Sequence, residues 1–398
     1  MQNPRLNGLS DYFFRRLAAL LEPVAPSTTH EPIDLSIGQP MHPTPELLTE
    51  TLQANGHLWR RYPPVLGSAE FRDAVRAWLT KRYRLPEAML AADEHILPVA
   101  GTKEALFMLS LLVTPEQKGG GRPAVLMPNP FYNVYLGGAL MAGAEPVLLP
   151  VSATTHHLPD LDRLTPDLLD RTVAFFLCSP ANPQGSAADC DYLTKALRMA
   201  RRHDFLLILD ECYSEIYTRM PPTGGLEAAA SLADGLDNLL VCHSLSKRSN
   251  AAGLRSGFVA GDRKIIKEFT RLRSYAAAVQ PLPVLAAAIA LWQDEHHVEE
   301  NRRLYREKFD LADHYLSGRF DYARPDGGFF LWLNVGDSEA ITRRLWSEAA
   351  LKVVPGAYLG RDDRQQGWNP GAHAIRVALV HDMATTEQAL IRLVGTLG

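Results

Sequence analysis

The chain has 398 residues, of which 46% are hydrophobic and 22% are charged, and its formal net charge at pH 7 is −4. These are the values of a globular protein with a large core, and the length is enough for two domains. The slight acidity and the absence of a long basic run argue against a nucleic-acid partner, and no apolar stretch is long enough to span a membrane.

The cysteines and histidines show no metal or disulfide pattern. The first residues lack the features of a secretory signal, and four cysteines without a CxxC pair are not a disulfide scaffold in a chain of this length. We therefore expect buried free thiols in a cytoplasmic protein. The adjacent pairs His156-His157 and His296-His297 do not share a helical face, so we expect no metal site.

Short apolar runs alternate with helical patterns between about residues 95 and 260. The helical patterns include 102–113 and 189–204. Continuous apolar runs bracketed by helices predict a mostly parallel sheet covered on both faces, and thus an α/β fold. The predicted strands are PAVLMP (123–128), PVLLPV (146–151), VAFFLCSP (173–180), FLLILDE (205–211), LLVCHS (239–244) and SGFVAGD (256–262).

The pattern changes after residue 280. One long helical stretch, about 281–317, leads to a Gly-Gly turn, a strand, a helix and the run AIRVALV (374–380). This order predicts a smaller α+β domain. We expect residues 46–280 to form the large domain, 281–398 the small one, and the N-terminal segment 1–45 to pack with the small domain, because its amphipathic helix is too short to be stable alone.

Polar residues follow several of the predicted strands. In a parallel sheet the carboxyl ends of the strands meet at one edge, where ligands gather. The candidate residues at these ends, with those at the opening of the helix after residue 100, are Gly101, Thr102, Tyr132, Asn182, Asp210, Tyr213, Ser244, Ser246 and Lys247.

Some of these residues are suited to binding an anion. A helix start, here at Gly101 and Thr102, offers free N–H groups to a phosphate. Ser244 and Ser246 add hydroxyl donors, and Arg255 adds a forked cation. Lys103 either contributes to the phosphate or merely occupies the first turn of the helix.

The other candidates are suited to an aldehyde on an aromatic ring. Lys247 is an amine that can condense with an aldehyde, and Asp210 is a carboxylate that can keep a ring nitrogen protonated. Tyr132 can lie over the ring, while Asn182 and Tyr213 can bond its phenolate oxygen. A phosphate, an aldehyde and a pyridine ring together describe pyridoxal phosphate.

Eight segments occur in an order that is typical of one enzyme family. They are LSIGQP, RYPPVLGSAEFR, GTKEAL, PNPFYNVY, SPANPQG, DECY, SLSK with the later Arg255, and IRVAL. With them the chain resembles the class I/II, fold-type I aminotransferases over essentially its whole length. The resemblance implies an aspartate-aminotransferase-like fold with a seven-stranded large sheet, pyridoxal phosphate as cofactor, and ping-pong transamination. Lys247 would then act as general base and acid, and Asp210 would make the ring an electron sink.

The resemblance also implies roles outside the sheet. Gly38 would lie against the substrate carboxylate, which Arg376 would grip in a bidentate pair while Asn182 orients the guanidinium. Tyr62 would reach the cofactor phosphate of the neighbouring subunit, which implies a homodimer with shared active sites. The sequence Asn-Pro-Gln-Gly replaces the commoner Asn-Pro-Thr-Gly and leaves the role of Asn182 intact.

A finer resemblance is to the bacterial N-succinyldiaminopimelate aminotransferases of lysine biosynthesis. It depends on NPRLNGLSDYFFRRLAALL, LSIGQPMHPTP, GGFFLWLNV and VVPGAYLGR with NPGAHAIRVALV. It implies glutamate as donor and N-succinyl-2-amino-6-oxopimelate as acceptor. Such an acceptor carries a distal carboxylate, for which Arg273, Arg248 and the pair Arg60-Arg61 are candidate partners.

Three alternatives remain. A broad aspartate, aromatic or kynurenine aminotransferase would share every residue named above, and a pyridoxal-phosphate-dependent C–S lyase would release ammonia and pyruvate. A transcription regulator would need an added DNA-binding module, and the enzyme-like pattern begins near residue 34 and leaves no room for one.

Overall fold

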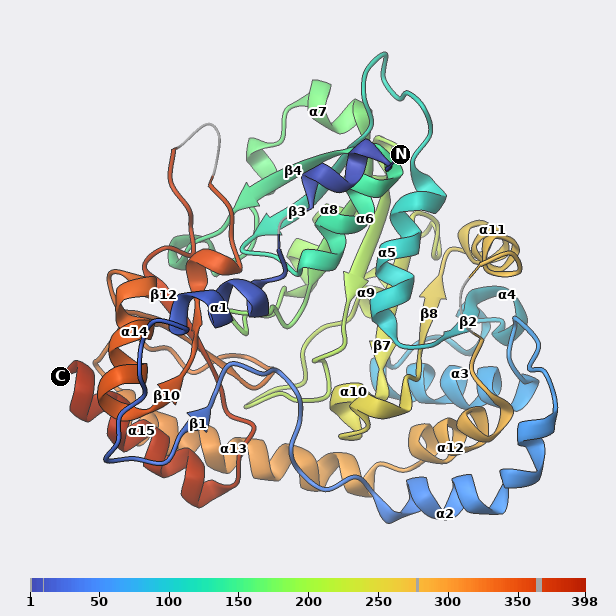
Figure 1. Cartoon of the computed structure of the whole chain (residues 1–398). Coiled ribbons are helices and arrows are strands. Elements are labelled where there is room, and N and C mark those ends of the chain that lie inside the picture. The colour runs from blue at the N-terminus through green and yellow to red at the C-terminus, as the bar shows by residue number, and fades with distance from the viewer. Residues whose placement is uncertain (1, 10, 277–278, 363–366) are drawn as a thin grey trace.

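The computed structural model describes residues 2–9, 11–276, 279–362 and 367–398. A seven-stranded sheet forms its centre, with the strand order β2-β8-β7-β6-β5-β3-β4 (Figure 1). Only β8 in this sheet runs against the others, because it pairs antiparallel with both β2 and β7 while the remaining pairs are parallel. The strands are β2 (Ile96–Val99), β3 (Ala124–Asn129), β4 (Glu145–Pro150), β5 (Thr172–Cys178), β6 (Leu206–Asp210), β7 (Leu239–Ser244) and β8 (Gly257–Gly261).

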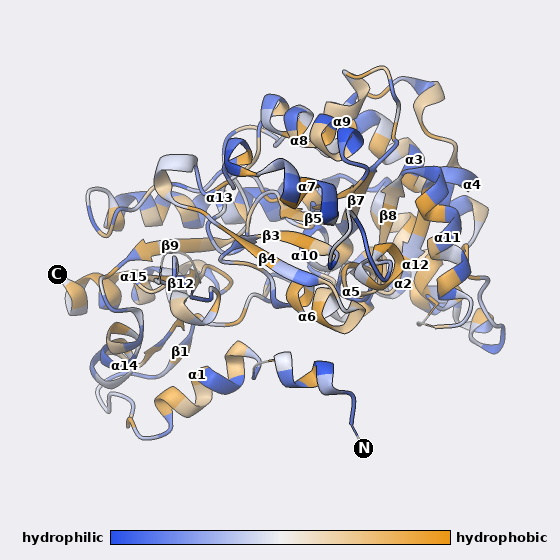
Figure 2. Cartoon of the chain, turned by 90° about the horizontal axis from the view of Figure 1, so that it is seen from above, coloured by the Kyte–Doolittle hydropathy of each residue, from blue (hydrophilic) through white to orange (hydrophobic). Residues whose placement is uncertain are grey.

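Helices cover both faces of this sheet. The α-helices in the described residues are α1 (Phe13–Leu21), α2 (Glu46–Ala54), α3 (Ala69–Tyr83), α4 (Ala92–His95), α5 (Thr102–Val113), α6 (Asn133–Ala142), α7 (Pro166–Arg171), α8 (Cys190–Arg202), α9 (Gly225–Ala230), α10 (Leu245–Arg248), α11 (Arg263–Arg273), α12 (Leu282–Gln293), α13 (His296–Leu316), α14 (Ser338–Ala349) and α15 (Met383–Leu397). The apolar strand residues appear as the orange interior in Figure 2.

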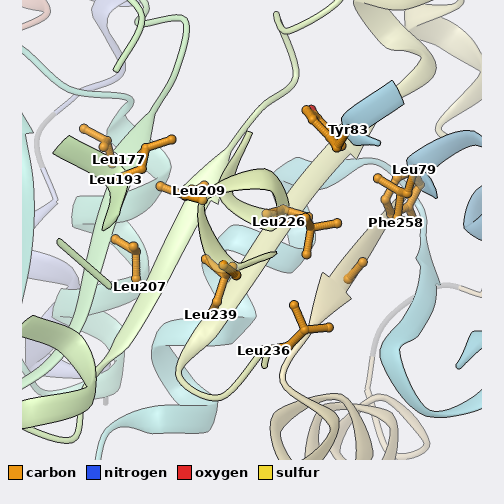
Figure 3. Close-up of a cluster of buried hydrophobic side chains, with 14 of the residues drawn as sticks. Leu79, Tyr83, Leu177, Leu193, Leu207, Leu209, Leu226, Leu236, Leu239 and Phe258 are labelled. Atoms are coloured by element: carbon orange, nitrogen blue, oxygen red, sulfur yellow. The ribbon is translucent and has the colours of Figure 1, made fainter. Parts of the chain in front are cut away.

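The two faces of the sheet have separate cores. Alternate residues of a strand point to opposite faces, so Phe175 and Leu177 of β5 pack with α3, α8, α9 and α12, whereas Ala174 and Phe176 pack with α5, α6 and α11. Figure 3 shows part of the first core, where Leu177, Leu207, Leu209 and Leu239 meet leucines from the helices. Burial on both faces explains why these strands are continuous apolar runs.

The predicted α/β fold with a mostly parallel large sheet is confirmed, and each of the six predicted runs overlaps a strand. The strand β2 was missed, because ILPV is short, contains a proline and directly follows a helical turn. Within the described residues no helix has both the length and the apolar character needed to cross a bilayer.

A second, smaller group of elements lies beside the large sheet. It contains the antiparallel sheet β11-β12-β9 and the parallel pair β1-β10, packed on α13, α14 and α15. Its strands are β1 (Ile33–Asp34), β9 (Phe330–Asn334), β10 (Leu351–Lys352), β11 (Val354–Pro355) and β12 (Ala374–Ala378).

The N-terminal segment is divided between the two groups. α1 packs against Val354, Tyr358 and Leu359, and β1 pairs with β10. The turn Pro4–Gly8 instead lies on α6 of the large sheet, where Arg5 donates a hydrogen bond to the carbonyl of Met141 (2.8 Å). Residues 1–45 therefore do not pack as one unit.

The predicted boundary at residue 281 differs from the packing. α12 lies against α2 and α3, and its Leu285, Leu291 and Trp292 belong to the core of the large sheet. The reason is that α12 is apolar nearly all round, as buried helices are. The chain leaves the core of the large sheet only at Asp294. Its carboxylate accepts a hydrogen bond from the N–H of His297, in the first turn of a separate helix, α13. The rest of the domain division stays a prediction.

Candidate active site

A cavity of about 250 Å³ lies at the carboxyl ends of the parallel strands. Short loops after β3, β5, β6 and β7 bring side chains there, and α1 and β12 close it from the smaller group of elements. The residues predicted to bind the cofactor or the substrate α-carboxylate all line the cavity except Gly101 and Tyr62; those that line it are Gly38, Thr102, Lys103, Tyr132, Asn182, Asp210, Tyr213, Ser244, Ser246, Lys247, Arg255 and Arg376.

Lys247 lies in the short helix α10, directly after β7. Its Nζ donates a hydrogen bond to the carbonyl of Gly38 (2.5 Å) and lies 5.3 Å from the centre of the Phe329 ring. Burial lowers the pKa of Lys247 to about 8. A substantial fraction of this amine is therefore neutral close to physiological pH, and the neutral form is the nucleophile.

Asp210 is the last residue of β6 and is only 3% exposed. The hydroxyl of Tyr135 donates to Oδ2 (2.9 Å), and the backbone N–H of Cys212 is 3.4 Å from Oδ1. Burial raises the pKa of Asp210, and these hydrogen bonds partly oppose that rise. No cation of the described residues forms an ion pair with this carboxylate. Asp210 can therefore pair with a cationic group placed in the cavity.

The start of α5 and the loop after β7 form an anion-binding corner. The hydroxyls of Ser244 and Ser246 lie 2.9 Å apart, and Arg255 donates to Ser246 Oγ (3.4 Å) and to the carbonyl of Ala100 (3.3 Å). Gly101 precedes α5 with φ +85°, and a Cβ at this position would collide with the Arg255 guanidinium. Gly101 therefore allows the cation to lie against the start of the helix, although it does not itself line the cavity.

Arg376 is a buried cation that also lines the cavity. Its guanidinium donates to Asn182 Oδ1 (3.1 Å) and to the carbonyl of Ser36 (2.8 Å), and it lies 4.3 Å from the centre of the Phe330 ring. Burial lowers the pKa of Arg376 to about 10, so that it stays cationic at neutral pH. An uncompensated buried cation is suited to a carboxylate ligand.

Two tyrosines complete the predicted set. Tyr132 directly precedes α6, and its ring meets that of Tyr135 edge-on at 5.7 Å. Tyr213 is buried, with its ring edge-on to Phe329 and Phe330, and burial raises the pKa of its hydroxyl. Both hydroxyls therefore stay protonated and can donate hydrogen bonds.

Several residues at this site were missed from the sequence. Tyr12, Phe13 and Phe14 of the α1 region line the cavity, and Tyr135 holds Asp210. The aromatic triplet was read only as the start of an amphipathic helix. Tyr135 follows Tyr132 by three residues, and side chains with this spacing lie next to each other at the start of a helix. This spacing was the signal in the sequence that could have placed Tyr135 beside the site.

Two of the four candidates for the distal carboxylate are already paired with acids. Arg273 is buried and paired with Glu104. Arg248 donates to the carbonyl of Leu291 (2.6 Å) and pairs with Glu295 (2.7 Å). Neither arginine lines the cavity, so the pair Arg60-Arg61 remains as the candidate from this set.

Tyr62 and the pair Arg60-Arg61 lie outside the cavity on exposed chain, and Tyr62 is 101% exposed. Their role stays a prediction that needs a second subunit. The four cysteines are free thiols, as predicted, and no cluster of His, Cys, Asp or Glu in the described ranges is placed to hold a metal ion.

The residues that line the cavity fit pyridoxal phosphate. They offer a buried amine with a lowered pKa, a buried carboxylate for a ring nitrogen, and an anion-binding corner with a glycine where a side chain would displace Arg255. The cofactor inferred from the sequence thus has a chemically complementary site.

Comparisons with known proteins agree with this site. The profile of the family "Aminotransferase class I and II" matches residues 30–393. The crystal structure of an aminotransferase from Neisseria meningitidis is similar over 100% of both chains, with 41% identity and a TM-score of 0.94. A probable aminotransferase of Mycobacterium tuberculosis is 33% identical over 92% of this chain and 80% of its own length.

A further solved structure is described as a probable N-succinyldiaminopimelate aminotransferase from Thermus thermophilus. It is 25% identical with a TM-score of 0.83, and the match covers 97% of this chain and 100% of that chain. Aminotransferases of class I and II depend on pyridoxal phosphate, which confirms the predicted cofactor. From the fold, the cavity and these matches, the chain belongs to the class I and II aminotransferases.

Proposed function

We propose that the enzyme transfers the amino group of glutamate to N-succinyl-2-amino-6-oxopimelate and so forms N-succinyl-LL-2,6-diaminopimelate. The observation that carries this acceptor is a second cation at the cavity. Lys103 lines the cavity, and its ammonium lies 5.5 Å from the centre of the Tyr12 ring without an acidic partner among the described residues. An acceptor with carboxylates beyond the α-carboxylate needs such a cation in addition to Arg376. The likeness to the Thermus thermophilus protein further supports this acceptor.

The residues have distinct tasks in this proposal. Pyridoxal phosphate, when bound, supplies an aldehyde and an electron-withdrawing ring. Arg255, the hydroxyls of Ser244 and Ser246 and the start of α5 at Gly101 and Thr102 would hold its phosphate. Asp210 would bind the ring nitrogen, Tyr132 would lie on the ring face, and Asn182 and Tyr213 would bond the phenolate oxygen.

Lys247 moves the proton. Its Nζ would take the proton from the α-carbon of the amino donor and, in the half-reaction with the acceptor, deliver a proton to the carbonyl carbon that becomes the amino-bearing carbon; taking up the proton requires a neutral amine at the working pH. The lowered pKa of Lys247, about 8, supports this task, and the hydrogen bond to the carbonyl of Gly38 orients the amine.

Arg376 binds the substrate α-carboxylate, with Gly38 beside it. Asn182 and the carbonyl of Ser36 hold the guanidinium in place, and Phe330 supports its flat face. The aromatic side chains of Tyr12, Phe13 and Phe14 border the same cavity and reduce the access of water to the reacting atoms.

The active enzyme in this proposal is a homodimer with shared sites. Fully exposed Tyr62 lies in a segment with the exposed apolar side chains of Trp59 and Leu66. Large exposed apolar residues of this kind support a protein interface. If Tyr62 completes the neighbour's site, a mixture of Lys247→Ala and Tyr62→Ala subunits regains activity that neither variant has alone; equal inactivity of mixture and variants would contradict shared sites.

The acceptor is tested by competition. Purified holoenzyme with glutamate is offered the succinylated oxo-acid together with oxaloacetate and phenylpyruvate, and the products are separated. We expect the succinylated acceptor to be preferred. Lys103→Met should raise the KM for this acceptor by about tenfold, in keeping with the loss of one charge-assisted hydrogen bond, and leave that for phenylpyruvate unchanged. Lys264→Met, on the exposed side of α11, is the matched control.

A broad aromatic aminotransferase is the second candidate. The observation in its favour is the group of aromatic side chains at the cavity, formed by Tyr12, Phe13, Phe14 and Phe330. Equal or better turnover of phenylpyruvate in the competition would favour this function and would contradict the succinylated acceptor.

A further inference from the structure

The loop between β1 and α2 contacts Lys247 at two places. At one end, the carbonyl of Gly38 accepts a hydrogen bond from Lys247 Nζ (2.5 Å). At the other end, His42 Nδ1 lies 2.8 Å from Asn301 Oδ1, and the amide nitrogen of Asn301 donates to the backbone carbonyl of Lys247 (3.2 Å). The same loop therefore reaches both the side chain and, through Asn301, the main chain of Lys247.

The hydrogen bonds continue from His42 to a buried lysine. Lys308 of α13 is 1% exposed, and its Nζ lies 2.6 Å from His42 Nε2 and 3.3 Å from the carbonyl of Leu379. The ring of Tyr305 packs beside both groups, with its centre 4.5 Å from that of the His42 ring and 5.1 Å from Lys308 Nζ. Asn301, Tyr305 and Lys308 follow helical spacing, so one face of α13 supplies all three contacts.

With Lys308 protonated, the four groups allow one consistent direction; burial lowers the pKa of Lys308 to about 8, so this form predominates below that pH. An ammonium has donors only, so Lys308 donates to His42 Nε2, and the ring proton of neutral His42 is then on Nδ1. That proton is donated to Asn301 Oδ1, which turns the Asn301 amide nitrogen toward the carbonyls of Lys247 and Arg248 (3.2 and 3.4 Å). Burial and the positive charge of Lys308 both lower the pKa of His42, in agreement with the neutral ring.

The carbonyls at the end of α10 need such a partner. α10 has four residues, and the last carbonyls of a helix have no acceptor role within the helix itself. A helix of one turn also has little stability of its own. Its orientation, and with it the direction of the Lys247 side chain, therefore depends on outside contacts such as that of Asn301.

We propose that His42 is a positioning residue for Lys247: with Lys308 behind it, it fixes the Asn301 amide that holds the main chain of α10. The inference rests on the role proposed for Lys247. His42 does not line the cavity and takes no part in binding substrate. Its loss should therefore change the proton-transfer step and the environment of Lys247, and not the affinity for glutamate.

Two variants separate positioning from mere packing. His42→Phe keeps a flat ring beside Tyr305 and removes both hydrogen bonds. His42→Asn is the conservative variant, because its amide can still donate to Asn301 Oδ1 from the position of Nδ1. His203→Phe is the matched control, since His203 bonds to Asp170 (2.8 Å) and is not among the residues that line the cavity.

The readouts are the half-reaction with glutamate and the pH titration of the bound cofactor's absorbance in the holoenzyme. We expect His42→Phe to lower kcat about tenfold or more with an unchanged KM for glutamate, as displacement of a reacting group does, and to shift the absorbance titration. His42→Asn should restore both toward wild type. His203→Phe should change neither.

The inference is overturned if His42→Phe retains the wild-type kcat and titration, or if His42→Asn is impaired as severely as His42→Phe. A lowered melting temperature without a shifted titration would also overturn it, because it would reveal a purely structural role. Failure of the proposed function is recognised separately, in wild type: borohydride reduction of the holoenzyme would not leave the cofactor on Lys247, or glutamate would not react.

Discussion

Removing the Tyr135 hydroxyl should weaken the binding of the cofactor through its effect on Asp210. In Tyr135→Phe the ring keeps its stacked contact with Phe176, at 4.9 Å between ring centres, so that only the hydrogen bond to Asp210 Oδ2 (2.9 Å) is lost. A hydrogen bond to a charged group contributes about 1.5–3 kcal/mol. We therefore expect the Kd of pyridoxal phosphate to rise by about 10- to 150-fold.

The pH dependence gives a second, independent sign. Burial raises the pKa of Asp210, and the Tyr135 hydrogen bond opposes that rise. Without Tyr135 the pKa is higher still, so the carboxylate becomes neutral at a higher pH as the solution is acidified. Because only the carboxylate attracts a protonated ring nitrogen, the affinity of the variant should begin to fall at a higher pH than that of wild type.

The measurement is an absorbance titration of the apoenzyme with pyridoxal phosphate over a range of pH. Tyr192→Phe is the matched control, because it removes a hydroxyl that donates to the carbonyl of Pro159 (2.9 Å), outside the active-site cavity. If Tyr135→Phe binds the cofactor as tightly as Tyr192→Phe, with the same pH dependence, the reasoning about Asp210 is refuted.

Four further outcomes are expected. Arg376→Lys should raise the KM of every oxo-acid by about tenfold or more in steady-state assays, because lysine cannot form the bidentate pair; a change for one acceptor alone would contradict this. Glu215→Gln, which leaves the buried Arg82 without its ion partner (2.7 Å), should lower the free energy of unfolding in urea by about 3–5 kcal/mol. The pKa of Glu215 is lowered from 4.5 in the folded protein, so the stabilisation is present above pH 4.5 and is lost as the pH falls through the folded pKa. The unfolding free energies of wild type and variant should therefore converge in acid, and a difference that is independent of pH would contradict this. The rate at which the apoenzyme attaches the cofactor should rise with pH and level off above about 8, because only the neutral amine of Lys247 reacts, and a rate independent of pH would contradict the lowered pKa. Arg248→Met should destabilise the fold yet leave acceptor selectivity unchanged, and altered selectivity would return Arg248 to the substrate site.

The sequence predicted the central sheet and most of the cavity for one physical reason. Strands buried on both faces are continuous apolar runs, and the residue after such a run lies at the edge where parallel strands converge. Asp210, Asn182 and Lys247 could therefore be placed together although they are distant in the chain. Each stands directly at, or a few residues beyond, the end of an apolar run.

What failed depended on contacts between distant segments. Arg248 has the charge expected of a substrate ligand, but its partner Glu295 is 47 residues away, and nothing in the sequence shows that the pair is closed. α12 is apolar enough to pack in either domain, and only the fold shows which. The sequence indicates that the aromatic residues at α1 belong to an amphipathic helix, but it does not show that they line the active-site cavity.

Position 101 illustrates how tightly this site limits evolutionary change. Its left-handed φ of +85° and the guanidinium of Arg255 exclude a side chain there for two unrelated reasons. A shorter side chain at position 255 would make room for a Cβ at position 101, but the backbone there would still have a φ that disfavours other residues. A change in that φ alone would leave the collision between the Cβ and Arg255. A side chain at position 101 would thus both strain the backbone and displace the Arg255 guanidinium, so this way of holding an anion depends on glycine there.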